Sequence, residues 1–157
     1  MIDQIYIYFT IEMIFLWLNF GVLPLWLVLI IFPQSQICRV FITSIFPIFV
    51  LSLTYGYLLY FFFNDGYDFI RNFELYLGLD AVSNLFTNKA FVILFWLHFL
   101  SMNLFCGSWI VKDSQKFGIN KILISFPLLI TYFIGPIGLT LYWILRIFYA
   151  KRINLYD

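Results

Sequence analysis

The chain has 157 residues, of which 64% are hydrophobic, 24% aromatic and only 11% charged. An average soluble domain carries roughly 25% charged residues, so this composition excludes a soluble globular protein and indicates an integral membrane protein. The formal net charge of +1 argues against a nucleic-acid partner, because such proteins present a strongly basic face. The two cysteines lack metal-ligand spacing, which predicts free thiols and no metal. The sequence has no phosphate loop and no dinucleotide fingerprint, and we expect no cofactor.

The first apolar stretch, residues 11–32, predicts a transmembrane helix. Pro24 near its middle removes a backbone donor, so we expect a kink that frees a carbonyl group close to Asn19. Asn19 is therefore a candidate for lining a ligand pocket, with the alternative that it only bonds the freed carbonyl or a neighbouring helix. Glu12 at the start of the helix is either a catalytic acid or base, or an ordinary carboxylate at the membrane interface.

The second span covers residues 40–63 and is almost wholly apolar, with an aromatic end that suits the headgroup level. Residues 67–89 follow, and their apolar and charged side chains recur on opposite faces at helical spacing. This pattern predicts a short amphipathic helix on the membrane surface, with Asp80 or Ser83 capping a second short helix. The segment is either a plain connector or a lid over a lipid-facing cavity.

The third span, residues 90–111, places polar side chains inside an apolar run. His98 is the only histidine of the chain and lacks partners for a metal site. It is either a hydrogen-bonded core residue or a functional group, which is the default interpretation of an ionisable side chain in a membrane. An acid–base pair such as Glu12 with His98 suits a redox-neutral rearrangement of a lipophilic substrate.

The fourth predicted span, residues 122–149, is longer than a bilayer core requires, so it must tilt, or bend at Pro127 or Pro136. On a helical wheel, one face of this segment carries Gly135, Gly138, Leu139, Tyr142, Arg146 and Tyr149. The glycines would allow a flat ligand or another helix to approach, and Arg146 either acts in the site or extends to the interface. Nothing divides the chain, which predicts one domain over residues 1–157.

Three blocks of sequence are similar to those of a known family: VLPLW after Asn19; WLHFL followed by LFCGSWI and Asp113; and GPIGLTLYWILR at 135–146. From about Asn19 to Arg146 the chain resembles the small membrane-protein family whose plant member is named for abscisic acid deficiency. That plant protein is needed to form neoxanthin, an allenic carotenoid, from violaxanthin. The family pattern has an aspartate where this chain has Asn103 and an arginine where it has Ser108. Either the two charges form one network in the family and were lost together here, or this chain only binds a polyene or supports a complex.

The resemblance and the residues together predict an all-α membrane protein, a four-transmembrane-helix bundle with an interfacial segment between its second and third helices. We expect it to isomerise or otherwise modify an oxygenated carotenoid within the bilayer, or to be a non-catalytic pigment- or lipid-binding subunit of a larger membrane assembly. A transporter is disfavoured, since no inverted repeat is evident. The candidate catalytic residues are His98, Arg146 and Glu12. The candidate substrate-binding residues are Asn19, Trp96, Asn103, Trp109, Gly135, Gly138 and Tyr142. The expected partners are a lipophilic small molecule and membrane lipid, and the expected location is a bacterial cell membrane or a photosynthetic membrane.

Overall fold

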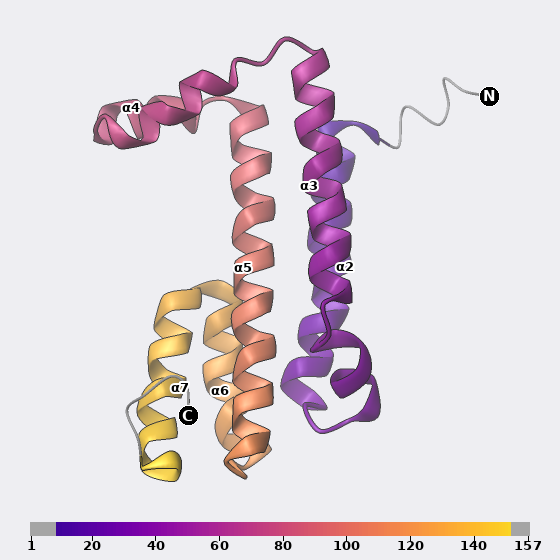
Figure 1. Ribbon diagram of the computed structural model, residues 1–157, viewed down its shortest axis with the longest axis vertical. Helices are drawn as coiled ribbons and strands as arrows, with labels where there is room; N and C mark the ends of the chain where they lie inside the picture. The colour runs from indigo at the N-terminus through magenta and orange to yellow at the C-terminus, as the bar shows by residue number, and fades with distance from the viewer. Residues whose placement is uncertain (1–8, 152–157) are drawn as a thin grey trace, which may run out of the picture. The chain divides into compact units, whose positions relative to one another are not determined.

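The computed structural model describes residues 9–151, and within this range the regular structure is entirely helical (Figure 1). The predicted all-α class is therefore confirmed. Three helices of the described range are long and apolar enough to cross a membrane: α2 (Ile11–Ile31), α3 (Phe46–Asn64) and α5 (Lys89–Lys116). They correspond to the first three predicted spans.

The described residues form two compact units. Unit 1 consists of residues 9–21 and 49–100, and unit 2 consists of residues 22–48 and 101–151. Helices α2, α3 and α5 contribute residues to both units, because the division falls within each of them.

In unit 1, the first half of α2 packs with α3 and with the beginning of α5. Buried aliphatic side chains from all three helices form its core, among them Leu18, Leu58 and Leu97. Large apolar side chains on the outer faces remain exposed, for example Trp17 at 63% and Phe63 at 71%. Exposed apolar surface of this kind is costly in water, whereas lipid covers it without penalty.

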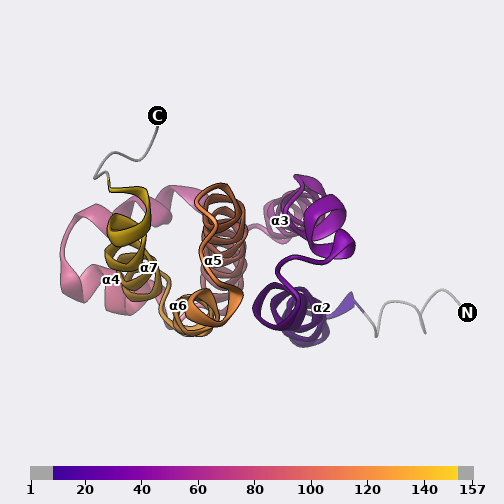
Figure 2. The ribbon, with the colours of Figure 1, turned by 90° about the horizontal axis from the view of Figure 1, so that it is seen from below.

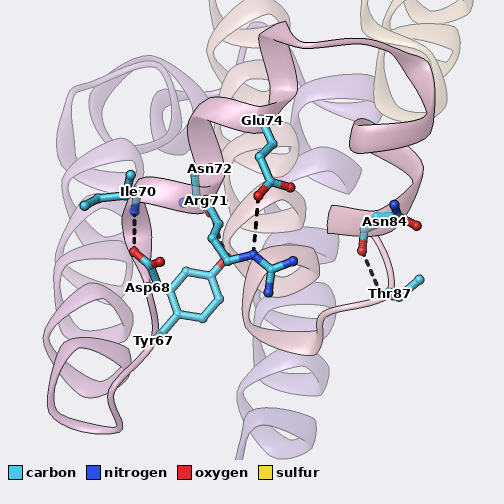
Figure 3. A network of polar contacts seen from close by, with 8 residues as sticks. All are labelled: Tyr67, Asp68, Ile70, Arg71, Asn72, Glu74, Asn84 and Thr87. Carbon is cyan, nitrogen blue, oxygen red and sulfur yellow. Dashed lines mark hydrogen bonds and ion pairs between the residues drawn. The ribbon is translucent and has the colours of Figure 1, made fainter.

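Between α3 and α5, unit 1 contains the 3-10 helix η3 (Phe69–Tyr76) and the short helix α4 (Leu79–Leu85). Figure 3 shows the polar contacts that fix this segment. Asp68 Oδ1 accepts a hydrogen bond from the backbone N–H of Ile70 at 3.0 Å and so caps η3, and Tyr67 Oη donates to Asn72 Oδ1 at 2.7 Å. Burial raises the pKa of the Tyr67 hydroxyl, which keeps it protonated as a donor.

The capping residue of α4 differs from the sequence prediction. The N-cap of α4 is Gly78, in a backbone conformation with φ 144°, rather than Asp80 or Ser83. Several apolar side chains of the segment are exposed, including Ile70 at 76% and Leu77 at 78%. Its placement on a membrane surface stays a prediction.

The predicted fourth span is corrected by the structure, because residues 122–149 form two helices, α6 (Lys121–Phe133) and α7 (Gly135–Ala150). The break lies at Ile134, whose backbone is extended at φ −139° and ψ 80°. Pro136 has no N–H, so a continuous helix would lose the bond from residue 136 to the carbonyl group of Tyr132. At 13 residues, α6 extends about 20 Å, which is shorter than the roughly 30 Å core of a bilayer.

Helix α7 folds back beside α6 to make a helical hairpin (Figures 1 and 2). The close approach depends on Gly138, because a Cβ atom at this position would overlap both the side chain and the backbone of Thr131. Another close contact in unit 2 joins α2 to α5: the ring of Trp26 lies 2.7 Å from the position that a Cβ on Gly107 would occupy. Trp26 is 2% exposed, and its Nε1–H has no hydrogen-bond partner within residues 9–151.

The other helix ends follow local signals. Helix α3 begins at Phe46, six residues after the predicted start, because Ser44 Oγ accepts the Phe46 N–H at 3.2 Å and Pro47 suits a first helical turn. A π-helical turn, η2 (Cys38–Ile42), occupies the preceding residues. Helix α5 continues to Lys116 and ends before Gly118, whose φ of 64° favours glycine.

Candidate functional site

Unit 1 contains an apolar groove of about 430 Å³ between the first turns of α2, the α4–α5 connection and the first turns of α5. It is lined by Ile11, Glu12, Phe15, Leu16, Phe86, Thr87, Lys89, Val92 and Ile93. Glu12 Oε1 and Lys89 Nζ lie 2.9 Å apart and form an exposed ion pair in the lining of this groove. The groove thus combines apolar walls with one acidic and one basic group.

Local capping places the two charged residues. Thr10 Oγ1 accepts a hydrogen bond from the N–H of Met13 at 3.3 Å at the start of α2, which puts Glu12 in the first turn. Asn88 Oδ1 accepts the N–H of Ala90 at 2.8 Å, so α5 begins at Lys89. A side-chain oxygen that satisfies first-turn N–H groups defines where a helix starts. Both charges therefore occupy the beginning of a span.

Asn19 and Trp96 meet further along the same two helices. Each lies seven residues after its charged counterpart in the ion pair, about 10 Å along a helix. Trp96 Nε1 donates a hydrogen bond to Asn19 Oδ1 at 3.1 Å, and Asn19 Nδ2 donates to the Phe15 carbonyl oxygen at 2.6 Å. The structure thus brings together three predicted site residues, Glu12, Asn19 and Trp96, along one line of contact between α2 and α5.

His98 is not part of this line of contact. It lies two residues after Trp96 on an exposed face of α5, and its imidazole makes no hydrogen bond, ion pair or ring contact with the described residues. The distance along α5 from Lys89 to His98 is about 13 Å. Glu12 pairs instead with Lys89, which the sequence analysis did not select. The sequence did contain a signal for this pair, because Glu12 and Lys89 each stand at the start of a long apolar segment.

A second group of predicted residues lies in unit 2 around Asp113. The carboxylate atom Oδ2 of Asp113 accepts a hydrogen bond from Tyr142 Oη at 2.6 Å and one from Arg146 Nε at 2.7 Å. The side chains of Arg146 and Asp113 are only 2% and 9% exposed. Spacing explains the arrangement, because Tyr142 and Arg146 are four residues apart and share one face of α7.

Aromatic rings surround this ion pair. The guanidinium carbon of Arg146 lies 4.7 Å from the ring centroid of Phe117 and 5.1 Å from that of Trp143. The rings of Trp109 and Tyr142 pack edge to face, with their centroids 5.6 Å apart. A cation over an aromatic face is stabilised by the ring quadrupole. Tyr142 and Arg146 share one face of a helix, as the helical wheel predicted, whereas Trp109 was predicted only as a separate substrate-binding candidate. In the structure the polar groups of Tyr142 and Arg146 are directed at Asp113, which the sequence analysis did not include in the site.

Asn103 occupies a separate position in unit 2. Its Nδ2 donates to the Tyr132 carbonyl oxygen at 3.4 Å, the same carbonyl that Pro136 leaves without a helical donor. A Cβ atom on Gly135 would overlap Asn103 Oδ1. Asn103 precedes Asp113 by ten residues, about 15 Å along α5, so Asn103 and Arg146 do not share a site. Gly135 and Gly138, which were predicted to allow a flat ligand or another helix to approach, lie against Asn103 and Thr131 of the same chain.

Ser108 lies on the same helix as Asn103 but faces a different element. Ser108 Oγ donates to the Ile42 carbonyl oxygen of η2 at 3.3 Å. Five residues separate it from Asn103, which is a rotation of about 140° on α5. Both neutral side chains therefore bond backbone carbonyl groups, and they point to different partners.

The two thiols are free, as predicted. Burial raises the pKa of Cys38 to about 11, so this residue is a neutral thiol at physiological pH. Among residues 9–151, no three His, Cys, Asp or Glu side chains group as metal ligands would.

Comparison with known proteins identifies a family. Residues 13–142 match the sequence profile of the family described as ABA4-like, or ABA DEFICIENT 4-like. The match includes Asn19, Lys89, Trp96 and Asp113, whereas Glu12 and Arg146 lie just outside it. No curated protein and no solved structure matches the chain significantly.

Proposed function

Because the chain belongs to the ABA4-like (ABA DEFICIENT 4-like) family, we propose that it is a multi-pass membrane protein that binds an oxygenated carotenoid and isomerises or otherwise modifies it within the bilayer. The proposed location is a bacterial cell membrane or a photosynthetic membrane. The observation that carries the proposal is the groove of unit 1, in which an apolar wall lies beside the Glu12–Lys89 ion pair.

The size and the lining of the groove suit one end of an oxygenated carotenoid. Ligand sites are mostly apolar, measure roughly 300–1,000 Å³ and carry a few placed polar groups. A groove of about 430 Å³ accommodates an oxygenated end ring and the adjoining part of a polyene, and the remaining chain extends into lipid. Phe15 and Trp96, whose rings lie 5.9 Å apart, offer an aromatic surface alongside.

The ion pair provides the groups for a redox-neutral isomerisation. In the proposed step, the Lys89 ammonium group donates a proton to an epoxide oxygen as its C–O bond breaks, and the Glu12 carboxylate accepts a proton from carbon. The electrons of the broken C–H bond form the new C=C bond, so the substrate is neither oxidised nor reduced. At 2.9 Å, the proton returns directly from Glu12 to Lys89. Positioned acids and bases contribute roughly 10²- to 10⁴-fold to a rate.

A second candidate is a non-catalytic pigment- or lipid-binding subunit of a larger assembly. The observation in its favour is that Asn103 and Ser108, where the family pattern has charges, are neutral and bonded to backbone carbonyl groups. Under this alternative the groove holds a carotenoid or lipid without changing it.

The test is expression in a carotenoid-producing host, with chromatography of the cell pigments and of the organic extract of the purified protein. We expect a new isomer with the wild-type chain, and bound but unconverted pigment with Glu12→Gln or Lys89→Gln. The matched controls are Arg71→Gln and Glu74→Gln, which change the same charges in an exposed ion pair of unit 1 outside the groove. These controls should convert normally.

Each other outcome has a clear meaning. A stoichiometric bound pigment with no conversion by any variant supports the binding subunit over the enzyme. An unchanged pigment profile with no pigment in the extract contradicts both candidates.

A further inference from the structure

Charge is unevenly distributed over the described chain. Among the described residues of unit 2, six basic residues accompany a single acidic residue, Asp113, which Arg146 already pairs. The basic residues are Arg39, Lys112, Lys116, Lys121, Arg146 and Lys151. In unit 1 the described residues include two basic side chains, Arg71 and Lys89.

The helical hairpin gathers these cations at one end of unit 2. Helix α7 returns to the level at which α6 begins, because Arg146 bonds Asp113 near the end of α5 and lies over Phe117 just after it. Lys151 at the end of α7 therefore belongs with the α5–α6 loop. If α6 and α7 made one span, Lys151 would lie across the membrane from that loop. Cytoplasmic loops carry the excess of Lys and Arg, which puts this end of unit 2 on the cytoplasmic side.

A polar hollow of about 750 Å³ opens between the loops at this end. Two cations, Arg39 and Lys121, line it together with the amide groups of Gln34, Gln115 and Asn120. Gln115 Nε2 donates to the Pro33 carbonyl oxygen at 2.8 Å and so joins the last turn of α5 to the α2–η2 loop. Neither Arg39 nor Lys121 forms an ion pair within the described residues, and no carboxylate lines the hollow. Its side chains thus provide positive charge and donors for an anion.

Apolar side chains flank both cations. Ile37 and Val40 beside Arg39 are 65% and 68% exposed, and Ile122 beside Lys121 is 73% exposed. The hollow lies directly after the ends of the spans α2 and α5, the level at which headgroups meet hydrocarbon. A phosphate with acyl chains beneath it matches this combination, since basic side chains next to spans attract anionic lipids.

We infer that the hollow between the α2–η2 and α5–α6 loops binds the phosphate of an anionic phospholipid in the cytoplasmic leaflet, with Arg39 and Lys121 as the recognising groups. The site is separate from the carotenoid groove proposed above, and either assignment can fail without the other.

Lipid retention tests the site. We expect the purified protein to retain phosphatidylglycerol in preference to phosphatidylcholine in native mass spectrometry, and to bind it in titrated nanodiscs. Arg39→Gln/Lys121→Gln should weaken that binding by about 10-fold or more, as expected for two charges near an anionic surface. The matched control Arg71→Gln/Lys112→Gln removes two charges outside the hollow and should weaken it much less. Equal retention of the two lipids, an equal loss in the control, or displacement of the lipid by millimolar inorganic phosphate would overturn the assignment.

Cysteine labelling tests the side of the membrane. In a bacterial host, a membrane-impermeant maleimide should label Asp80→Cys in intact cells and leave Gln36→Cys unlabelled until the cells are opened. The wild-type chain gives the background, because Cys38 is fully buried and Cys106 partly so. Labelling of Gln36→Cys from outside would contradict the cytoplasmic placement.

Discussion

Arg146 and Asp113 form a nearly buried ion pair, with Arg146 Nε 2.7 Å from Asp113 Oδ2 and the two side chains 2% and 9% exposed. The pair connects the last turns of α7 to the last turns of α5 within unit 2. Because both side chains are almost completely buried, each charge is stabilised by the opposite charge of its partner. The end of α7 is therefore held by an ion pair, whereas the beginning of α7 is held by close packing of Gly138 against Thr131.

Asp113→Asn is expected to lower the free energy of unfolding by about 3–5 kcal/mol, because it removes the carboxylate charge opposite a buried guanidinium group. For a chain of this length the loss corresponds to roughly 10 °C in the thermal midpoint, measured on the detergent-solubilised protein. Tyr142→Phe removes one hydrogen bond to the same carboxylate and should cost only about 1–2 kcal/mol. Asp113→Leu/Arg146→Met should recover most of the stability. A double variant less stable than Asp113→Asn would contradict this account.

Gly138→Ala is expected to destabilise the hairpin strongly, because its Cβ would overlap the backbone of Thr131, which cannot move aside. Gly135→Ala meets only the side chain of Asn103, so its effect should be smaller, and it should vanish when Gly135→Ala/Asn103→Ala is compared with Asn103→Ala alone. Gly21→Ala and Gly56→Ala are the controls, since nothing lies within 4 Å of a Cβ atom there. Thermal midpoints in detergent provide the measurement, and equal midpoints for Gly138→Ala and Gly56→Ala would disprove the close packing.

Asn103→Asp is expected to destabilise unit 2, because a carboxylate cannot donate to the Tyr132 carbonyl oxygen that Asn103 now bonds. The cost should be about 2–3 kcal/mol, as for a buried polar group that loses its partner. Asn84→Asp makes the same change at an exposed position and should be neutral. Adding Ser108→Arg to Asn103→Asp should not restore stability, since the two positions contact different elements. Full recovery in this double variant would indicate one charge network instead.

Trp96→Phe retains an aromatic ring but removes the Nε1–H that donates to Asn19 at 3.1 Å. If the polar contact helps to define the carotenoid site, bound pigment should fall by about 5- to 10-fold, the value of one hydrogen bond. Trp17→Phe is the matched control, because Trp17 is 63% exposed on α2. Pigment absorbance per mole of purified protein measures both variants. Equal pigment content would remove Trp96 from the site.

Much of this arrangement followed from helical periodicity. The spacing predicted one face of six residues in this segment. Four of them are the buried residues of α7, namely Gly135, Gly138, Tyr142 and Arg146, whereas Leu139 is half-buried and Tyr149 is exposed. Periodicity works here because each turn presents the same side to its neighbours. The wheel placed Arg146 on the same face as Tyr142, but it left open whether Arg146 acts in the site or extends to the interface, and it contained no information about the acceptor on α5.

The helical hairpin could not be predicted in the same way. Residues 122–149 are apolar throughout, and length and composition alone favour a single span. Pro127 lies inside α6 without ending it, whereas Pro136 coincides with the break. The difference arises from partners distant in sequence, since Asn103 takes the place of the missing donor to Tyr132 and Gly138 accommodates Thr131. Similarly, the pairing of Lys89 with Glu12 depends on the packing of α2 with α5, which no local pattern specifies.

The packing of Trp26 against Gly107 has an optical consequence. Its indole is 2% exposed and lies against Gly107 and the ring of Tyr132, and within residues 9–151 nothing accepts its N–H. Fluorescence from such a ring stays at the blue end of the tryptophan range, because no nearby dipoles reorient around the excited state. Any rearrangement that admitted solvent beside Gly107 would shift that emission to the red, so the protein carries a natural reporter of its own interior.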